Sequence, residues 1–278
     1  MHKRDEHPSQ DGTMAFKQVL PKVYQNFLDR KILNLEISET KATCDNCLRA
    51  RDKRFPYTYE ANLKCCTFVP FLPNFAVGGI LKEKLDGHKV IEKMIGESRF
   101  ALPLGIFPDF DYQYRFTHKK QKDFGNREDL LCHYYDKEKN RCGIWEFRGV
   151  VCTTFFCRSD YGKSGQNLWT EMNNYLSYVE MALAEDCLVM KDFSPRDISD
   201  QLVFLNKKDF TKSEKTQTTI QPKELKLYWN GYTDPKEFYL SCYELVQKQT
   251  RKSFKEILGE QGLNLEKRVL QGYACLSK

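Results

Sequence analysis

The segment Asn62-Leu-Lys-Cys-Cys-Thr-Phe-Val-Pro-Phe71 places two cysteines, Cys65 and Cys66, side by side. The chain has 278 residues and eleven cysteines, which is an odd number. Eight of the cysteines fall between residues 44 and 157: Cys44, Cys47, Cys65, Cys66, Cys132, Cys142, Cys152 and Cys157. A hydrophobic core alone does not require such clustering, so we expect this part of the sequence to decide both fold and chemistry.

The sequence favours a metal site over a disulfide framework. Its first residues are charged and polar and lack the apolar core of a secretory signal. We therefore expect a cytoplasmic protein, in which thiols stay reduced and a disulfide framework is disfavoured. No run approaches the apolar length of a membrane helix, so we expect no membrane association.

The overall composition is that of a globular protein with a real core. Hydrophobic residues make up 41% and charged residues 29%, and the net charge is +6 from 44 basic and 38 acidic residues. This mild excess does not indicate nucleic acid, which is usually met by a clustered basic face. The stretch Tyr112-Gln-Tyr-Arg-Phe-Thr-His-Lys-Lys120 could stack on single-stranded nucleic acid, but we interpret it as a half-buried strand leading into a surface loop.

Helical patterns dominate the sequence outside the cysteine cluster. Residues 15–35 show helical spacing interrupted at Pro21, and residues 78–96 predict one or two helices broken near Gly87. The strongest pattern covers residues 166–190, with one apolar face: Leu168, Met172, Tyr175, Val179, Leu183 and Cys187. Ser194 and Pro195 predict the start of a further helix, and residues after 234 are again helical.

Two segments have the composition of strands. Residues 112–116 alternate, and residues 147–156 are rich in β-branched and aromatic side chains. We expect a mainly α fold with an irregular cysteine-rich metal-binding region and few short strands, of the α+β class. The predicted parts are a disordered tail at 1–14, a cysteine-rich metal-binding domain at 15–165, and a helical region at 166–278 packed on it.

The spacing of the eight cysteines is typical of metal ligation. Cys44-Asp-Asn-Cys47 predicts a tight turn whose two sulfurs face one metal. Neighbouring residues of an extended backbone point to opposite sides, so Cys65 and Cys66 rarely clamp one small ion. The pair favours either two metal sites or one bulky cluster.

Together, Cys44-Asp-Asn-Cys47, Cys65-Cys66 and the block from Cys132 to Cys157 resemble the YkgJ-type CxxCxxxCC domain. That family is described as zinc- or iron-chelating and includes the metal-binding part of flagellin lysine N-methylases. Its second block, C-x-I-Y-x-x-R-P-x-x-C, is matched at Cys142, Ile144, Arg148 and Cys152, with Trp145 and Gly149 standing for Tyr and Pro. The resemblance covers residues 44–157 and leaves the last part of the chain unexplained.

The resemblance implies a cysteine-ligated metal centre, and all eight cysteines are candidate ligands. Because thiolates are negatively charged, Arg141, Arg148 and Arg158, which are close in sequence, could tune the centre, and Arg148 could instead pair with Glu146 or Asp136. His133 could also be a ligand, but with eight cysteines available we interpret it as a bystander. One or two [4Fe–4S] clusters fit this number of ligands, and zinc is the alternative. Two hypotheses of function stay open. The first is an iron–sulfur protein with a redox or protein-modifying, methylase-like role and a protein substrate or partner. The second is a zinc-stapled interaction module without catalysis. Cys187 and Cys242 are expected in the core, and Cys275 near the terminus is not expected to be a ligand.

Overall fold

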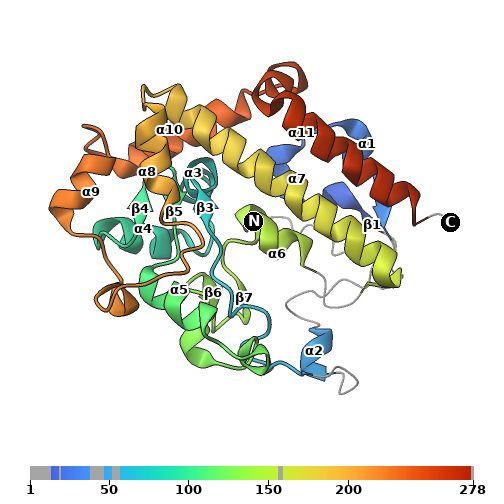
Figure 1. The fold of residues 1–278 in the computed structure, drawn as a ribbon, viewed down its shortest axis with the longest axis horizontal. Coiled ribbons are helices and arrows are strands. Elements are labelled where there is room, and N and C mark those ends of the chain that lie inside the picture. The colour runs from blue at the N-terminus through green and yellow to red at the C-terminus, as the bar shows by residue number, and fades with distance from the viewer. Residues whose placement is uncertain (1–13, 19, 38–46, 52–56, 156–158, 277–278) are drawn as a thin grey trace.

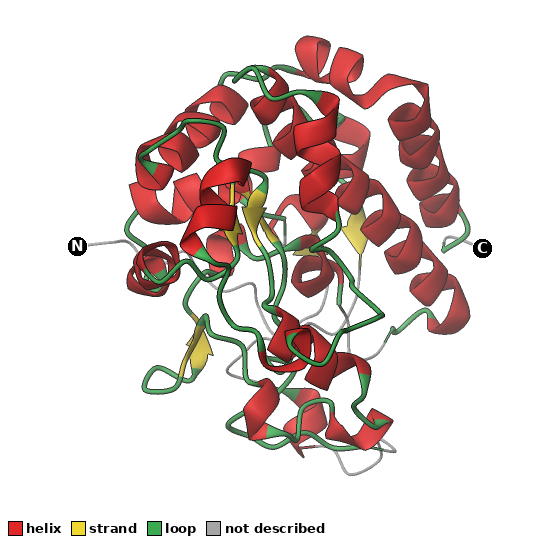
Figure 2. Cartoon of the chain, turned by 60° about the vertical axis from the view of Figure 1, so that its left-hand side comes forward, coloured by secondary structure: helices red, strands yellow, loops and turns green. Residues whose placement is uncertain are grey.

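The computed structural model describes residues 14–18, 20–37, 47–51, 57–155 and 159–276 (Figure 1). Nearly all of the predicted tail, together with Cys44, Cys157 and Arg158, lies outside the described residues. Helices make up most of the described chain, and the strands are short (Figure 2). The predicted fold class, mainly α with few short strands, is confirmed.

The helices differ greatly in length, from single turns to α7. They are α1 (Arg30–Leu33), α2 (Leu48–Arg51), α3 (Asn74–Lys82), α4 (His88–Gly96), α5 (Phe110–Thr117), α6 (Val150–Thr154), α7 (Gly162–Val189), α8 (Pro195–Leu202), α9 (Pro222–Tyr228), α10 (Pro235–Gln247) and α11 (Arg251–Ala274). Short 3₁₀ turns lie at Phe16–Gln18, Lys22–Tyr24, Gln121–Asp123, Glu128–Leu130, Trp145–Phe147 and Glu214–Thr216.

All strand pairings in the described part of the chain are antiparallel. β1 (Met14–Ala15) pairs with β2 (Glu36–Ile37), and β6 (Tyr135–Asp136) pairs with β7 (Arg141–Cys142). A three-stranded sheet has the order β3 (Leu72–Pro73), β5 (Gly105–Ile106), β4 (Ala101–Leu102). The register of the β6–β7 hairpin sets Tyr135 opposite Cys142.

The long helix α7 forms the axis of the apolar core and runs beside α11 in both views (Figures 1 and 2). All six residues of its predicted apolar face are buried, as the helical spacing requires. Cys187 is among them, and its thiol donates to the carbonyl oxygen of Cys242 on α10, 3.7 Å away. The prediction that Cys187 and Cys242 are core thiols is therefore confirmed.

Helix α3 crosses α10 at very close range because it carries two adjacent glycines. A Cβ atom on Gly78 would lie 1.9 Å from the carbonyl oxygen of Tyr239 on α10. A Cβ on Gly79 would lie 2.3 Å from the ring of Phe147. Because neither glycine has a side chain, α10 and the segment around Phe147, which leads into α6, can both pack closely against α3.

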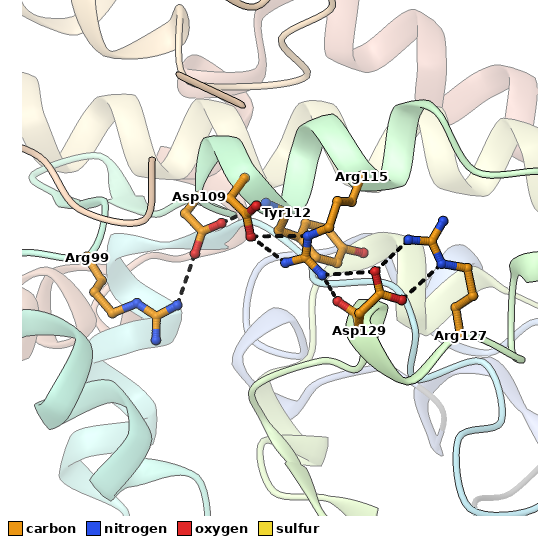
Figure 3. Close-up of polar contacts among 7 residues, drawn as sticks. Arg99, Asp109, Tyr112, Arg115, Arg127 and Asp129 are labelled. Carbon is orange, nitrogen blue, oxygen red and sulfur yellow. Dashed lines mark hydrogen bonds and ion pairs between the residues drawn. The ribbon is translucent and has the colours of Figure 1, made fainter. Parts of the chain in front are cut away.

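The prediction of a strand at residues 112–116 is wrong, because these residues belong to α5. Asp109 caps this helix, and its carboxylate accepts a hydrogen bond from the backbone N–H of Tyr112 at 2.8 Å. The same carboxylate pairs with Arg99 at 2.9 Å (Figure 3). An N-cap of this kind satisfies an otherwise unpaired helical donor, and it overrides the alternating pattern that follows.

The β-rich stretch predicted at 147–156 is not a strand over its described residues, 147–155, either. It contains the end of a 3₁₀ turn and then helix α6. The hydroxyl groups of Thr153 and Thr154 donate to the carbonyl oxygens of Gly149 and Val150, at 3.3 and 2.9 Å. Such bonds let threonine fit a short helix despite its β-branched side chain.

Other local predictions agree with the structure, with one exception. The break near Gly87 separates α3 from α4, and Ser194 caps α8 with Pro195 in its first turn. In contrast, residues 15–35 form short turns and strand β1 with only one short α-helix, α1. None of the helices among the described residues combines the length and apolarity needed to cross a membrane.

Candidate metal centre

Cysteines from segments far apart in the sequence meet around one cavity of about 540 Å³. We call it the cysteine cavity. Cys47 directly precedes α2, Cys132 follows a 3₁₀ turn, Cys142 lies on β7 and Cys152 on α6. Cys65 and Cys66 lie in the turn at residues 61–67, which precedes β3 in the chain.

The structure therefore brings together every described member of the predicted ligand set: Cys47, Cys65, Cys66, Cys132, Cys142 and Cys152. Cys44 and Cys157 are not described. Cys187 and Cys242 lie in the core between α7 and α10, and Cys275 is exposed. Within the described residues, no three or more His, Cys, Asp or Glu side chains form a group that could hold a single metal ion.

Backbone and side-chain hydrogen bonds hold the Cys65–Cys66 turn in place. The N–H of Cys132 donates to the carbonyl oxygen of Cys66 at 2.7 Å. The buried hydroxyl of Tyr112 donates to the carbonyl oxygen of Thr67 at 2.9 Å and accepts from the N–H of Val69 at 2.8 Å. These bonds fix the two cysteines relative to α5 and to the segment of Cys132.

Ion pairs fasten α5 to its surroundings and so support this arrangement (Figure 3). Arg115 binds Asp111 within the helix at 2.6 Å and reaches Asp129 at 3.4 Å. Arg127 holds the same Asp129 from the other side. Asp129 stands three residues before Cys132, so the network holds the segment that leads to this cysteine.

Burial raises the pKa of the thiols deepest in the cavity. For Cys152 burial is the largest cause, and the nearby charges of Cys132, Cys142 and Cys65 raise the pKa further. Burial likewise raises the pKa of Cys132, with contributions from Cys142 and Cys65. The thiols therefore hold their protons at neutral pH, and a metal that binds them must displace those protons.

Two cations lie close enough to the sulfurs to favour their ionised form. The charge of Arg148 lowers the pKa of Cys152, opposing the effect of burial, and Lys64 acts in the same way on Cys47. Arg148 is buried and lies over the Trp145 ring, 3.8 Å from its centroid. Of the predicted tuning residues, Arg148 lines the cavity, whereas Arg141 pairs with Asp86 at 2.8 Å.

His133, next to Cys132, does not line the cavity. Its Nε2 atom is buried and has no hydrogen-bond partner among the described residues. Burial lowers the pKa of His133, and the charge of Arg99 lowers it further. This agrees with its interpretation as a bystander of the cysteine site.

The cavity also has residues that the sequence did not identify. Lys64, Phe68, Lys119, Phe124 and Phe155 belong to its wall together with other aromatic side chains. Phe116 and Lys119 come from the aromatic and basic stretch at 112–120, so a signal existed but was assigned to a surface loop. Nothing in the sequence marks Lys64 or Phe155 in this way.

Comparison with protein-family models, curated proteins and solved structures gave no match, so the interpretation of the site depends on its own residues.

Proposed function

We propose that the protein binds a metal centre through the thiolates of the cysteine cavity, and that this centre is an iron–sulfur cluster. One observation carries the proposal: six predicted ligands from five separate segments line a single cavity. Cysteines brought together from so many segments are typical of metal ligation in a reduced protein.

The size of the cavity favours a cluster over a zinc ion. Structural zinc is held by four ligands in a small closed tetrahedron. A [4Fe–4S] cluster is larger, so its cysteines stand further apart around a volume such as this one. Because the described cysteines share one cavity, one site is favoured over two separate sites.

Four described cysteines form the proposed core of the ligand set: Cys65, Cys132, Cys142 and Cys152. Cys132 and Cys152 each lie near enough to Cys65 and Cys142 for their charges to interact. Cys47 interacts with Cys65. Four cysteines are left outside this set: Cys47 and Cys66, and Cys44 and Cys157, which lie outside the described residues. They remain candidates to replace one of the four ligands or to bind a second metal.

A cluster supplies one-electron redox chemistry, and the protein controls it through burial and nearby charge. Here Arg148 is placed to offset the negative charge of the thiolates. We assign the protein a redox or protein-modifying role in the cytoplasm, with a protein as substrate or partner.

The first experiment is purification without air, followed by measurement of iron, acid-labile sulfide and zinc per chain. About four irons with equal sulfide, and visible absorption from thiolate–iron charge transfer, are expected for one [4Fe–4S] cluster. Zinc alone in a colourless protein would contradict the cluster and favour a structural staple. Absence of both metals after reconstitution would contradict the metal centre itself.

Matched cysteine variants test the ligand set. Cys152→Ser is expected to lose most of the iron, since a proposed ligand is removed. Cys187→Ser and Cys242→Ser replace core thiols away from the cavity and are expected to keep it. Full iron and sulfide in Cys152→Ser would contradict the assignment of Cys152.

A further inference from the structure

The cysteine cavity has a second wall that carries no cysteine. This aromatic wall consists of Tyr59, Phe68, Phe116, Phe124 and Phe155. The whole cavity, shared by the cysteines and the aromatic wall, has a volume of about 540 Å³, within the range of pockets that enclose small organic ligands, roughly 300–1,000 Å³.

The rings of the aromatic wall are continuous with one another. Phe116 meets Phe68 edge to face at 5.4 Å between centroids, and it meets Phe124 at 6.4 Å. Phe124 in turn meets Tyr59 at 5.6 Å and Phe155 at 6.0 Å. Tyr112 stacks on Phe116 and Lys119 lies over the Phe116 ring, so a further flat molecule would contact the rings of Phe68, Phe124 and Phe155.

Part of the cavity wall is apolar and yet open to solvent. Phe155 is 39% exposed, Val151 43% and Tyr57 38%, and all three line the cavity. Large apolar side chains that cluster in one exposed place commonly mark a binding site. Their position at the cavity gives it an apolar rim that is open to solvent.

The charges around the cavity select the kind of molecule. Among the described residues that line it, the charged side chains besides cysteine are Arg49, Lys64, Lys119 and Arg148, and none is a carboxylate. Arg148 and Lys64 act on the cysteine sulfurs, as described above. Lys119 lies instead on the aromatic wall, with its ammonium 3.7 Å from the ring centroid of Phe116.

Lys119 is positioned as an anchor for an anion. Its ammonium donates to the carbonyl oxygen of Phe116 at 3.3 Å, and no carboxylate of the described residues lies within ion-pair distance. The nearest acidic influence comes from Asp123, which pairs with Arg127 at 3.5 Å. A partly buried ammonium with one neutral acceptor keeps donors for a ligand.

We infer that the cysteine cavity binds a planar aromatic anion, with its ring on the aromatic wall and its anionic group on Lys119. This deepens the proposed function, because the ligand occupies the same cavity as the metal centre and stands as its substrate or effector. Charge complementarity and aromatic contact carry the inference, and neither depends on which metal the thiolates hold.

Equilibrium dialysis of the purified full-length protein against naphthoate and naphthamide tests this. The two probes share ring and shape and differ in charge. We expect naphthoate to bind at one site per chain and Lys119→Gln to weaken it by about tenfold, the usual value of a charge-assisted hydrogen bond. Naphthamide should bind equally to both proteins. Lys119→Arg, which keeps the charge, should restore most of the naphthoate affinity.

Two further variants serve as controls. Lys120→Gln changes an exposed neighbour that does not line the cavity, and it should leave both probes unaffected. Phe124→Leu alters the aromatic wall and should weaken both probes. Failure of either probe to bind, or an equal response of both probes to Lys119→Gln, would overturn the inference.

Metal content measured on the same samples separates the two proposals. Iron and sulfide at wild-type levels with no naphthoate binding would contradict only the anion site. Naphthoate binding that depends on Lys119 in a protein without metal would contradict only the metal centre.

Discussion

The helical half of the molecule and its cysteine lobe are stabilised in different ways. The helical half comprises α3, α7, α10 and α11, and the cysteine lobe comprises the described residues of 47–71 and 110–155. In the helical half, long helices bury apolar faces against each other. The cysteine lobe has short helices and turns, and its strands β6 and β7 have two residues each, arranged around a cavity.

This difference indicates which half depends on a bound ligand for its stability. Apolar burial stabilises the helical half without anything bound, at about 25 cal/mol for each Å² removed from water. The cysteine lobe instead has buried thiols facing a space that protein atoms do not fill. Its stability should therefore depend on what occupies the cavity.

The largest expected effect comes from removing the proposed metal centre. For comparison, structural zinc contributes about 10–16 kcal/mol in zinc-finger peptides, whereas whole domains are stable by about 5–15 kcal/mol. We expect chelation under reducing, anaerobic conditions to abolish most amide-exchange protection in the cysteine lobe. Helices α7 and α10 should keep theirs. Hydrogen exchange with mass spectrometry measures both halves at once, and an equal loss in the two would contradict the distinction.

The same division explains how much of the structure the sequence could predict. Helix α7 was predictable because its burial follows a regular 3.6-residue period, and α8 because Ser194 and Pro195 are local start signals. For these two helices the deciding information lies within a few residues. Type and spacing also led us to expect the cysteines at one place, and the six described ones line one cavity, whereas their binding of a metal stays a prediction.

The errors have two sources. The alternating pattern at 112–116 was given more weight than a local start signal, the N-cap Asp109. The other source is contact between residues far apart in the sequence. The aromatic wall joins Tyr59, Phe116 and Phe155, which no local pattern connects. Lys119 also lines the cavity that the cysteines line, which spacing along the chain does not report.

A smaller effect is expected at Glu180, which connects the two halves. Its carboxyl group, on α7, accepts hydrogen bonds from the hydroxyl of Tyr24 at 2.8 Å and from the N–H of Val150, at the start of α6, at 3.4 Å. Burial raises the pKa of Glu180 to about 8, although both hydrogen bonds lower it. Helix α6 carries Cys152, so this carboxyl supports the proposed metal ligand.

The sign of the pH effect follows from the raised pKa. At low pH the group is protonated in both states and its contribution to stability is complete. As pH rises from about 4.5 to about 8, the unfolded chain loses the proton first, so the free energy of unfolding falls. The fall is at most about 1.4 kcal/mol per pH unit.

Glu180→Gln should remove this component and flatten the pH dependence between pH 5 and 7 (roughly the middle of the window). Urea unfolding at several pH values measures it. Glu244→Gln, which replaces an exposed carboxylate that pairs with Lys82, serves as the control and should follow the wild type. A wild-type slope in Glu180→Gln would show that the raised pKa of Glu180 is not the source of this pH dependence.

The smallest expected effect comes from removing the hydroxyl of Tyr112. This change leaves apolar burial unchanged, so it tests how much hydrogen bonding alone stabilises the cysteine lobe. Tyr112→Phe keeps the ring but leaves the Thr67 carbonyl and the Val69 N–H without that partner. We expect a loss of about 1–3 kcal/mol in the free energy of unfolding, the usual cost of an unsatisfied buried group. The Cys65–Cys66 turn should also release metal to a chelator faster than in the wild type.

Tyr114→Phe is the matched control on the same helix, because its hydroxyl makes no hydrogen bond among the described residues. It should change neither stability nor metal release. If Tyr112→Phe lowers stability without faster metal release, its hydroxyl supports the core alone. If both change together, a single side chain of α5 links the packing of the lobe to the retention of its metal, as the contacts of Tyr112 indicate.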